Sequence, residues 1–437
     1  MAAATGREQW DDRYLQQATR SVAYRVRKYG VAFPGTSAAG PQRPRKKPRT
    51  QKKKKKKKKK TQVARPPPLL PAAAPTKQGS KGAVTKRELE PYLKGSSWPC
   101  GATGPVIKVG SDCSGLDSVL TALDQLGLGR RVRAEFVCDK DPLCRKVLRS
   151  VHEPRVVYDD VTKRDVKDMP QVDLYTAGFP CQPWSSEGKG DGRCDRQGRG
   201  LIFDHVLKYI NEKLPKCFLL ENVLALSQAT HKKAFEKMLA SLRRSEEYFV
   251  TWRVVNAVNF GIPQNRPRVF IVGLLRSAVS EPSFPWPKPA TRSPLPLTRF
   301  LCGGAGVIRP LPGAGTVASG QLQRGLEAIR AEKGNPRTTD YSLDIWSGRD
   351  YPGRMTDRVP CITRTRGGAG GYYITSVRRL LTVEEMLNLQ GLPLSYRAVA
   401  RREGVSDRQL GMMVGNAIAT NVLRAILPRM LTKIGKQ

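Results

Sequence analysis

The strongest constraint on the fold is a regular alternation of short apolar runs with segments of helical periodicity, from about Val106 to Leu275. The apolar runs have the length of strands, and the intervening segments carry apolar residues three or four positions apart. We expect strands at 106–113, 134–139, 155–158, 172–177, 217–222, 251–258 and 269–275, and helices at 118–127, 141–151, 200–213 and 230–244. Because these strands are apolar throughout, the pattern predicts an α/β fold with a mostly parallel sheet and helices on both faces.

Composition divides the rest of the chain. Residues 276–356 are rich in Pro, Gly and Arg and show few periodic runs, which predicts a small irregular domain. Helical periodicity returns at 382–389 and 417–431, so 357–437 is expected to complete the domain that begins at residue 96. Residues 1–95 form a separate basic tail. We expect a short helix within 1–33 and disorder from Pro34 to about Lys94, where Pro, Ala and Lys dominate.

The net charge of +40 indicates a polyanionic partner. Fifteen Lys and Arg residues lie between Pro41 and Arg65, and subtracting them still leaves +25 on the rest of the chain. We therefore expect a basic folded surface as well as a basic tail. The nine lysines Lys52–Lys60 are typical of a nuclear-localisation signal or a nucleic-acid tether. A low-complexity linker without a receptor is the alternative, and we expect nuclear localisation.

Cysteine and histidine usage excludes several classes of protein. Nine cysteines occur without a CxxC pair, and there are three histidines, which argues against a zinc site and against a disulfide framework. The chain shows neither a signal region nor an apolar run long enough to span a membrane. We expect a soluble, intracellular protein, a monomer that binds no metal and no membrane.

Cys181 is the leading candidate for catalysis. It follows the apolar run 172–177 and lies between Pro180 and Pro183. A lone cysteine is usually a small buried hydrophobe. However, two flanking prolines fix the backbone and stop a helix or a central strand, which favours an exposed turn at a strand end. A nucleophile of an α/β enzyme is expected at such a position.

Further polar residues follow other predicted strands. The turn Ser111–Asp117 opens a helix and could hold a ligand on free N–H groups or be an ordinary turn. Asp139 and Asp160 end the next two strands, where an acid either accepts hydrogen bonds from a ribose or caps a helix. Glu221 and Asn222 close the run 217–220, and a buried carboxylate there would have a raised pKa or a structural partner.

Arg266 and Arg268, within Gln264-Asn-Arg-Pro-Arg268, are two residues apart. In an extended segment both side chains point to one face, where paired guanidinium groups suit a phosphate, a carboxylate or an oxyanion. The alternative is a solvated surface pair.

These motifs occur in an order that resembles the cytosine carbon-5 methyltransferase family. Gly178–Ser185 is similar to that family's catalytic-cysteine motif, Glu221–Val223 to its ENV motif and Gln264–Arg268 to its QxRxR motif. Residues 379–393 and Gly415-Asn416-Ala417 resemble its last two motifs. The resemblance covers about 106–275 and 357–432. It implies a Rossmann-like class I methyltransferase domain, with a target-recognition domain at 276–356.

The resemblance also implies a mechanism. Cys181 would add to carbon 6 of a flipped-out cytosine, Glu221 would bind ring nitrogen 3, Arg268 would stabilise the adduct and Asn222 would fix the loop. Either Arg266 or Arg268 would lower the pKa of the thiol. S-adenosylmethionine would be held by Ser114, Gly115, Asp139, Asp160, Pro180 and Asn416, with Asp139 on the ribose and Asp160 on the adenine edge. The loop 185–200, which contains five glycines, would close over the base.

The sequence departs from the family in its first motif. Cys113 stands where the family usually has Phe, and Asp117 stands where it has a second Gly, so the ring that packs on the cofactor is missing. We expect a nuclear DNA cytosine-5 methyltransferase that acts on double-stranded DNA. Two alternatives remain: a tRNA methyltransferase, which Pro360–Thr363 faintly resembles, and a catalytically inactive nucleic-acid-binding protein.

Overall fold

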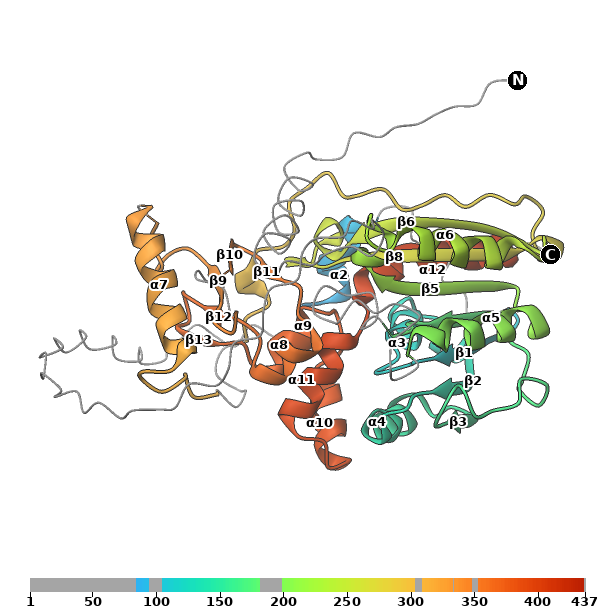
Figure 1. Ribbon diagram of the computed structural model, residues 1–437, viewed down its shortest axis with the longest axis horizontal. Helices are drawn as coiled ribbons and strands as arrows, with labels where there is room; N and C mark the ends of the chain where they lie inside the picture. The colour runs from blue at the N-terminus through green and yellow to red at the C-terminus, as the bar shows by residue number, and fades with distance from the viewer. Residues whose placement is uncertain are drawn as a thin grey trace, which may run out of the picture. The chain divides into compact units, whose positions relative to one another are not determined.

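The computed structural model describes residues 84–93, 104–180, 199–302, 309–332, 334–347 and 353–435. Within these residues, seven strands form the main sheet in the order β3-β2-β1-β4-β5-β8-β6 (Figure 1). They are β1 (Ile107–Asp112), β2 (Val132–Cys138), β3 (Val156–Tyr158), β4 (Leu174–Ala177), β5 (Cys217–Val223), β6 (Tyr248–Asn256) and β8 (Pro267–Leu275). Strands β1 to β5 are parallel, and β8 pairs antiparallel with β5 and β6. The predicted α/β class is confirmed.

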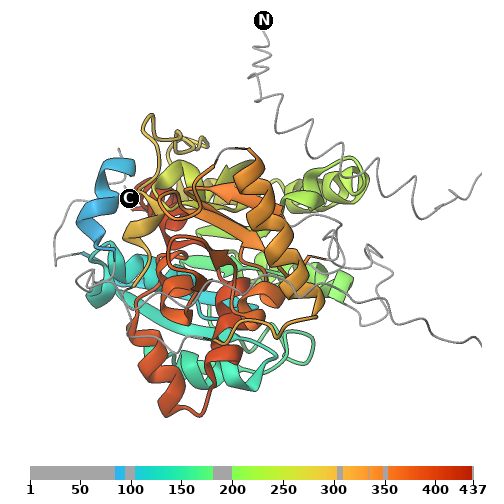
Figure 2. The same cartoon turned by 90° about the vertical axis from the view of Figure 1, so that its left-hand side faces the viewer.

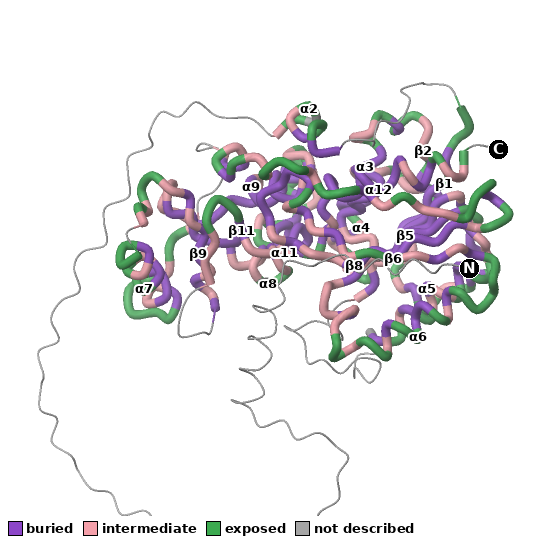
Figure 3. The backbone as a smooth tube through the Cα atoms, turned by 90° about the horizontal axis from the view of Figure 1, so that it is seen from above, coloured by how far each residue is buried: buried purple, intermediate pink, exposed green. Residues whose placement is uncertain are grey.

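Helices cover both faces of this sheet. α3 (Ser118–Gln125) and α12 (Thr420–Ile434) pack on one face, in a cluster that contains Leu219 of β5. α5 (Ile202–Lys213) and α6 (Lys232–Arg243) pack on the other face, with the next residue, Leu220. Because successive side chains of a strand point to opposite faces, β5 is buried on both sides. Figure 3 shows β5 as one of the buried strands.

The C-terminal segment adds several helices and returns to the main sheet. α8 (Arg364–Ala369), α9 (Val383–Asn388), α10 (Ser395–Arg402) and α11 (Asp407–Asn416) precede α12. α4 (Pro142–His152) contacts α10. α8 and α11 approach so closely that a Cβ on Gly411 would lie 2.3 Å from the carbonyl oxygen of Gly367. Predicted helices at 382–389 and 417–431 correspond to α9 and α12, with shifted ends.

A second, smaller sheet has the order β10-β9-β12-β13. Its strands are β9 (Tyr341–Asp344), β10 (Gly353–Thr356), β12 (Tyr373–Ile374) and β13 (Arg379–Leu380), and α7 (Val317–Ala331) packs against them through Leu322 and Ile329 (Figures 1 and 2). β12 and β13 follow residue 356, so the boundary expected there runs through this sheet. The sequence did not predict α7, because two internal glycines weaken its helical signal.

The prediction of disorder from 34 to 94 is wrong for residues 84–93. These residues form α2 (Lys86–Leu89) and a 3-10 turn (Glu90–Tyr92), and Leu89, Tyr92 and Leu93 are buried. Val84 N–H donates to Asn388 Oδ1 at 3.1 Å, and the Tyr92 hydroxyl donates to Ser293 O at 3.0 Å. These three apolar side chains lie within five residues and anchor the segment, although the basic composition around them indicates disorder. The predicted helix in 1–33 and Lys52–Lys60 lie outside the described residues.

Among the described helices, none alone is long and apolar enough to cross a membrane. α11 and α12 reach that length and hydropathy only as a pair, which is bent by 43°.

Candidate active site

The predicted site residues that the structure describes lie mostly where the strands of the main sheet end. Each of the five neighbouring parallel strands contributes one of them at its carboxyl end. They are the turn after β1, Asp139 after β2, Asp160 after β3, Pro180 after β4 and Glu221 near the end of β5. Parallel strands present their carboxyl ends at one edge, so the fold brings these residues to the same edge. Cys181 and the loop to residue 198 lie outside the described residues.

The turn Cys113–Asp117 is held by hydrogen bonds from its own side chains and from β2. Ser114 Oγ contacts the carbonyl oxygen of Ser111 at 3.1 Å and Cys138 N at 3.1 Å, which fixes the ends of β1 and β2 together. Gly115 N–H donates to Asp139 Oδ2 at 2.8 Å. Gly115 has a φ of +58°, and a Cβ placed on it would meet nothing within 4 Å. The turn therefore presents open backbone at its centre.

The departures from the family at this turn have a structural explanation. Asp117 adopts a left-handed conformation with a φ of 47°, which glycine favours and which Asp tolerates better than most residues. Its carboxylate accepts from Leu120 N at 3.0 Å and from the Ser111 hydroxyl, so it caps α3. Cys113 also has a positive φ of 52°. Burial raises the pKa of its thiol, which is therefore neutral.

The sequence left two roles open for Asp139, a hydrogen-bond acceptor for a ribose or a helix cap, and the structure gives the cap to Asp141 instead. Asp141 caps α4, because its Oδ1 accepts from Leu143 N at 3.0 Å. Asp139 is not that cap: its carboxylate accepts from Gly115 N and Asp141 N, each at 2.8 Å. Burial raises the pKa of Asp139, although both N–H groups partly offset this effect. Asp139 therefore reaches from the end of β2 to the turn after β1.

Asp160, like Asp139, is half-buried. Its Oδ1 accepts from Thr162 N at 2.9 Å and from Thr162 Oγ1 at 2.8 Å, and Lys140 Nζ lies 3.7 Å from Oδ2. Burial alone would raise its pKa, but these hydrogen bonds and the lysine outweigh that effect and the pKa is lowered. Asp160 is therefore an ionised hydrogen-bond acceptor at neutral pH.

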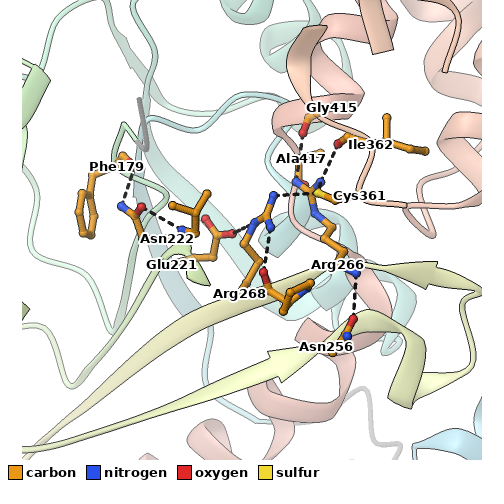
Figure 4. A network of polar contacts seen from close by, with 12 residues as sticks. Phe179, Glu221, Asn222, Asn256, Arg266, Arg268, Cys361, Ile362, Gly415 and Ala417 are labelled. Atoms are coloured by element: carbon orange, nitrogen blue, oxygen red, sulfur yellow. Dashed lines mark hydrogen bonds and ion pairs between the residues drawn. The ribbon is translucent and has the colours of Figure 1, made fainter. Parts of the chain in front are cut away.

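Glu221 forms an ion pair with Arg268 at the end of β5 (Figure 4). Arg268 Nε lies 3.1 Å from Glu221 Oε1, and the two side chains are 13% and 12% exposed. Burial raises the pKa of Glu221, and Arg268 and Arg266 oppose that shift without cancelling it. Glu221 can therefore carry a proton at a higher pH than an exposed glutamate does.

Asn222, the next residue, is buried on the opposite side of β5. Its Nδ2 donates to the carbonyl oxygen of Phe179 at 3.1 Å, and its Oδ1 accepts from Val223 N at 2.9 Å (Figure 4). Phe179 and Pro180 are the last described residues before Cys181. Asn222 thus fixes the segment that leads into the cysteine to the strand that carries Glu221.

Gln264, Arg266 and Arg268 alternate along the chain, and all three contact C-terminal segments. Gln264 Oε1 accepts from Ile362 N at 3.0 Å, and its Nε2 donates to Leu389 O at 2.7 Å. The guanidinium groups of Arg266 and Arg268 lie 3.2 and 3.3 Å from the sulfur of Cys361. The expected common face is present. Sequence reasoning missed Cys361 as a contact of both arginines, and the only signal was its position in Pro360–Thr363.

Arg266 binds backbone carbonyls on both sides of Asn416. Its Nη1 donates to Ile362 O at 2.7 Å, and its Nη2 donates to Gly415 O at 3.1 Å and Ala417 O at 2.6 Å. The residue is 2% exposed. Asn416, the last residue of α11, is exposed. These contacts make Arg266 a clamp on the segment that presents Asn416.

Comparisons with known proteins agree with this geometry. A family model described as C-5 cytosine-specific DNA methylase matches residues 107–432. The type II methyltransferase M.NgoBI of Neisseria gonorrhoeae is 30% identical over 285 residues, which are 64% of this chain and 81% of that protein. M.NlaX of Neisseria lactamica, also a type II methyltransferase, is 29% identical over 68% of this chain and 88% of its own length.

Two solved structures share the fold. The Entamoeba histolytica methyltransferase EhMeth aligns with a TM-score of 0.53 at 14% identity and covers 75% of this chain and 99% of its own. A putative DNA modification methyltransferase from an Escherichia coli prophage aligns with a TM-score of 0.52 at 16% identity, over 76% and 100%. Since the family model spans the main sheet, the small domain and the C-terminal helices, the chain belongs to the C-5 cytosine-specific DNA methylase family and is a DNA cytosine-5 methyltransferase that uses S-adenosylmethionine.

Proposed function

We propose that Cys181 forms the covalent bond to the target cytosine and that Glu221, Asn222 and Arg268 form the rest of its catalytic centre. The observation that carries this proposal is the pair of adjacent residues on β5. Glu221 has a raised pKa and pairs with Arg268, and Asn222 binds the carbonyl of Phe179, two residues before Cys181. An acid and a nucleophile would thus be positioned from one strand.

Carbon 5 of cytosine is too weak a nucleophile to take a methyl group unaided. Addition of the Cys181 thiolate to carbon 6 would make the ring an enamine, with the electron pair directed to carbon 5. Glu221 would donate a proton to ring nitrogen 3, so that the ring does not accumulate negative charge. After carbon 5 is methylated, a base removes the proton of carbon 5, the carbon–sulfur bond breaks and the thiolate leaves, and ring nitrogen 3 returns its proton to Glu221.

Arg268 would act on the charge of this centre. Its guanidinium already lies 3.1 Å from Glu221 and can stabilise the developing negative charge on the base or bind its phosphate. Arg266 would act at a distance, because its contacts with Gly415 and Ala417 orient the segment of Asn416.

The residues at the strand ends fit S-adenosylmethionine. Gly115 has open space around it, and its N–H is held toward Asp139, whose carboxylate suits a ribose diol. The ionised Asp160 can accept from the adenine amino group. Ser114, Pro180 and Asn416 would complete the site. When bound, S-adenosylmethionine supplies an electrophilic methyl group, and the chain's residues orient it toward the base.

Double-stranded DNA is the proposed substrate and the nucleus the proposed location. A duplex hides carbon 6, so the base must flip out, at a cost of about a few kcal/mol. The net charge of +40 and the arginines of the small domain support phosphate and guanine contacts. The nine lysines Lys52–Lys60 support nuclear import, and a reporter fused to residues 41–65 that stays outside the nucleus would contradict it.

The experiment for the proposed function offers labelled S-adenosylmethionine with duplex DNA and, separately, with tRNA. We expect label in DNA with the wild-type chain and none with Cys181→Ser. Label in tRNA alone would contradict the DNA substrate. Transfer to DNA that persists in Cys181→Ser would contradict the role of Cys181.

A further inference from the structure

A buried charged cluster lies directly behind the turn Cys113–Asp117. Asp112, the last residue of β1, accepts hydrogen bonds from both terminal nitrogens of Arg164 and from the hydroxyl of Tyr175 on β4. The Arg164 and Asp112 side chains are 4% and 0% exposed. The rings of Phe136 and Tyr158 each lie 5.5 Å from the guanidinium carbon. None of these residues takes part in the mechanism described above.

Stability alone does not explain such a cluster. Removing two charges from water is costly, and an apolar pair of similar volume is often as stable as a buried ion pair or more stable. The surroundings here are apolar, because the cluster lies among Phe136, Tyr175 and Tyr209 of the core beneath α5. A bidentate pair does supply a fixed geometry that apolar side chains do not.

The cluster joins the two segments expected to hold S-adenosylmethionine. Asp112 immediately precedes the turn that contains Ser114 and Gly115, and Arg164 lies four residues after Asp160. The preceding residue, Ser111, points to the other face of β1, where its hydroxyl binds Asp117. The start of the turn is therefore anchored on both faces of the sheet, and one of these anchors reaches the Asp160 segment.

We propose that Arg164, acting through Asp112, is a positioning residue for S-adenosylmethionine: it sets the spacing between the Ser114-Gly115 turn and Asp160. This inference rests on the proposed cofactor site. The turn contains three residues of positive φ, Cys113, Gly115 and Asp117, so its shape needs support from outside. Support from Arg164 also fits a motif that lacks the family's aromatic ring and second glycine.

The test compares single and double replacements in the full chain. Arg164→Met leaves Asp112 buried without its cation, so we expect loss of both folding stability and cofactor affinity. In the double variant Asp112→Leu with Arg164→Met, both charges are gone. We expect its urea midpoint to recover most of that loss but not all of it, because the buried Tyr175 hydroxyl no longer has Asp112 as its acceptor. Its Kd for S-adenosylmethionine, measured by calorimetry, should stay about tenfold above wild type, since a displacement of about 1 Å in a site is enough to weaken it by that much.

Two controls separate the possible results. Arg155→Met removes an exposed arginine that pairs with Glu135 at 3.3 Å on the same part of the sheet, and it should bind the cofactor like wild type. Arg164→Lys keeps the charge without the bidentate fork and should bind with intermediate affinity. DNA affinity without cofactor should be unchanged in all these variants.

A double variant that regains both stability and cofactor affinity would overturn the positioning role. The variant Asp139→Ala tests the proposed cofactor site separately from the role of Arg164. If Asp139→Ala weakens binding while the double variant binds normally, the inference is wrong and the proposed cofactor site stands. If Asp139→Ala binds like wild type, the proposed cofactor site is wrong and the inference fails with it.

Discussion

Replacing Arg266 with Met should destabilise the fold more than most single substitutions. The guanidinium of Arg266 donates to Ile362 O, Gly415 O and Ala417 O, and the residue is 2% exposed. Ala417 O also lies 3.4 Å from Gln390 Nε2, so the main loss is at the other two carbonyls. Each buried acceptor left without a donor costs about 1–3 kcal/mol. Removal of a buried cation offsets part of that sum.

We therefore expect a loss of about 3 kcal/mol, which is a large share of a typical total of roughly 5–15 kcal/mol. Urea unfolding followed by tryptophan fluorescence, without cofactor, measures it. Arg253→Met is the matched control: Arg253 is exposed on β6, and its replacement should stay within about 0.5 kcal/mol of wild type. A change as small as this for Arg266→Met would refute the assignment of Arg266 as a clamp.

Three further expectations concern helix packing, pH and salt. Gly411→Ala places a Cβ 2.3 Å from Gly367 O and should cost roughly 1–3 kcal/mol in thermal unfolding, whereas Gly313→Ala, with open space around it, should be neutral. Because the pKa of Glu221 is raised, its protonated form persists to higher pH, and methylation should slow as pH rises through that pKa. Glu221→Gln cannot ionise, so its weaker activity should lack this decline, and an identical pH profile would exclude Glu221 as the proton donor. Deleting residues 41–65 should flatten the dependence of DNA affinity on salt by about 0.9 in log–log slope for each phosphate that the tail no longer neutralises, and an unchanged slope would show that the tail does not bind DNA.

Local sequence patterns predicted the frame of the site well. The strands β4 and β5 are buried on both faces along their apolar runs, and β1 is buried apart from Lys108, so each reads as a strand, and the residues that follow it or end it lie at the same edge of the sheet. The spacing of Arg266 and Arg268 predicted a common face, because the two-residue period of an extended chain is a local property.

Contacts between distant segments were beyond the sequence. Arg266 binds carbonyls about 150 positions away, and nothing local distinguishes it from Arg268, which pairs with Glu221 instead. Arg164 lies among other charged residues, a pattern typical of an exposed segment. In the structure this segment packs beneath α5, and Arg164 is buried in its ion pair with Asp112. Residues 84–93 read as part of the basic tail, because three buried side chains carry less weight in composition than the lysines around them.

The covalent role of Cys181 can be tested most directly with a DNA duplex that carries 5-fluorocytosine at the target position. After methyl transfer, the fluorine cannot leave carbon 5 as a proton does, so elimination of the cysteine stops and the adduct persists. We predict a complex of protein and DNA that survives denaturation, requires S-adenosylmethionine and maps to the peptide containing Cys181. A complex that also forms with Cys181→Ser, or one that maps to Cys361, would contradict the assignment of Cys181 as the nucleophile.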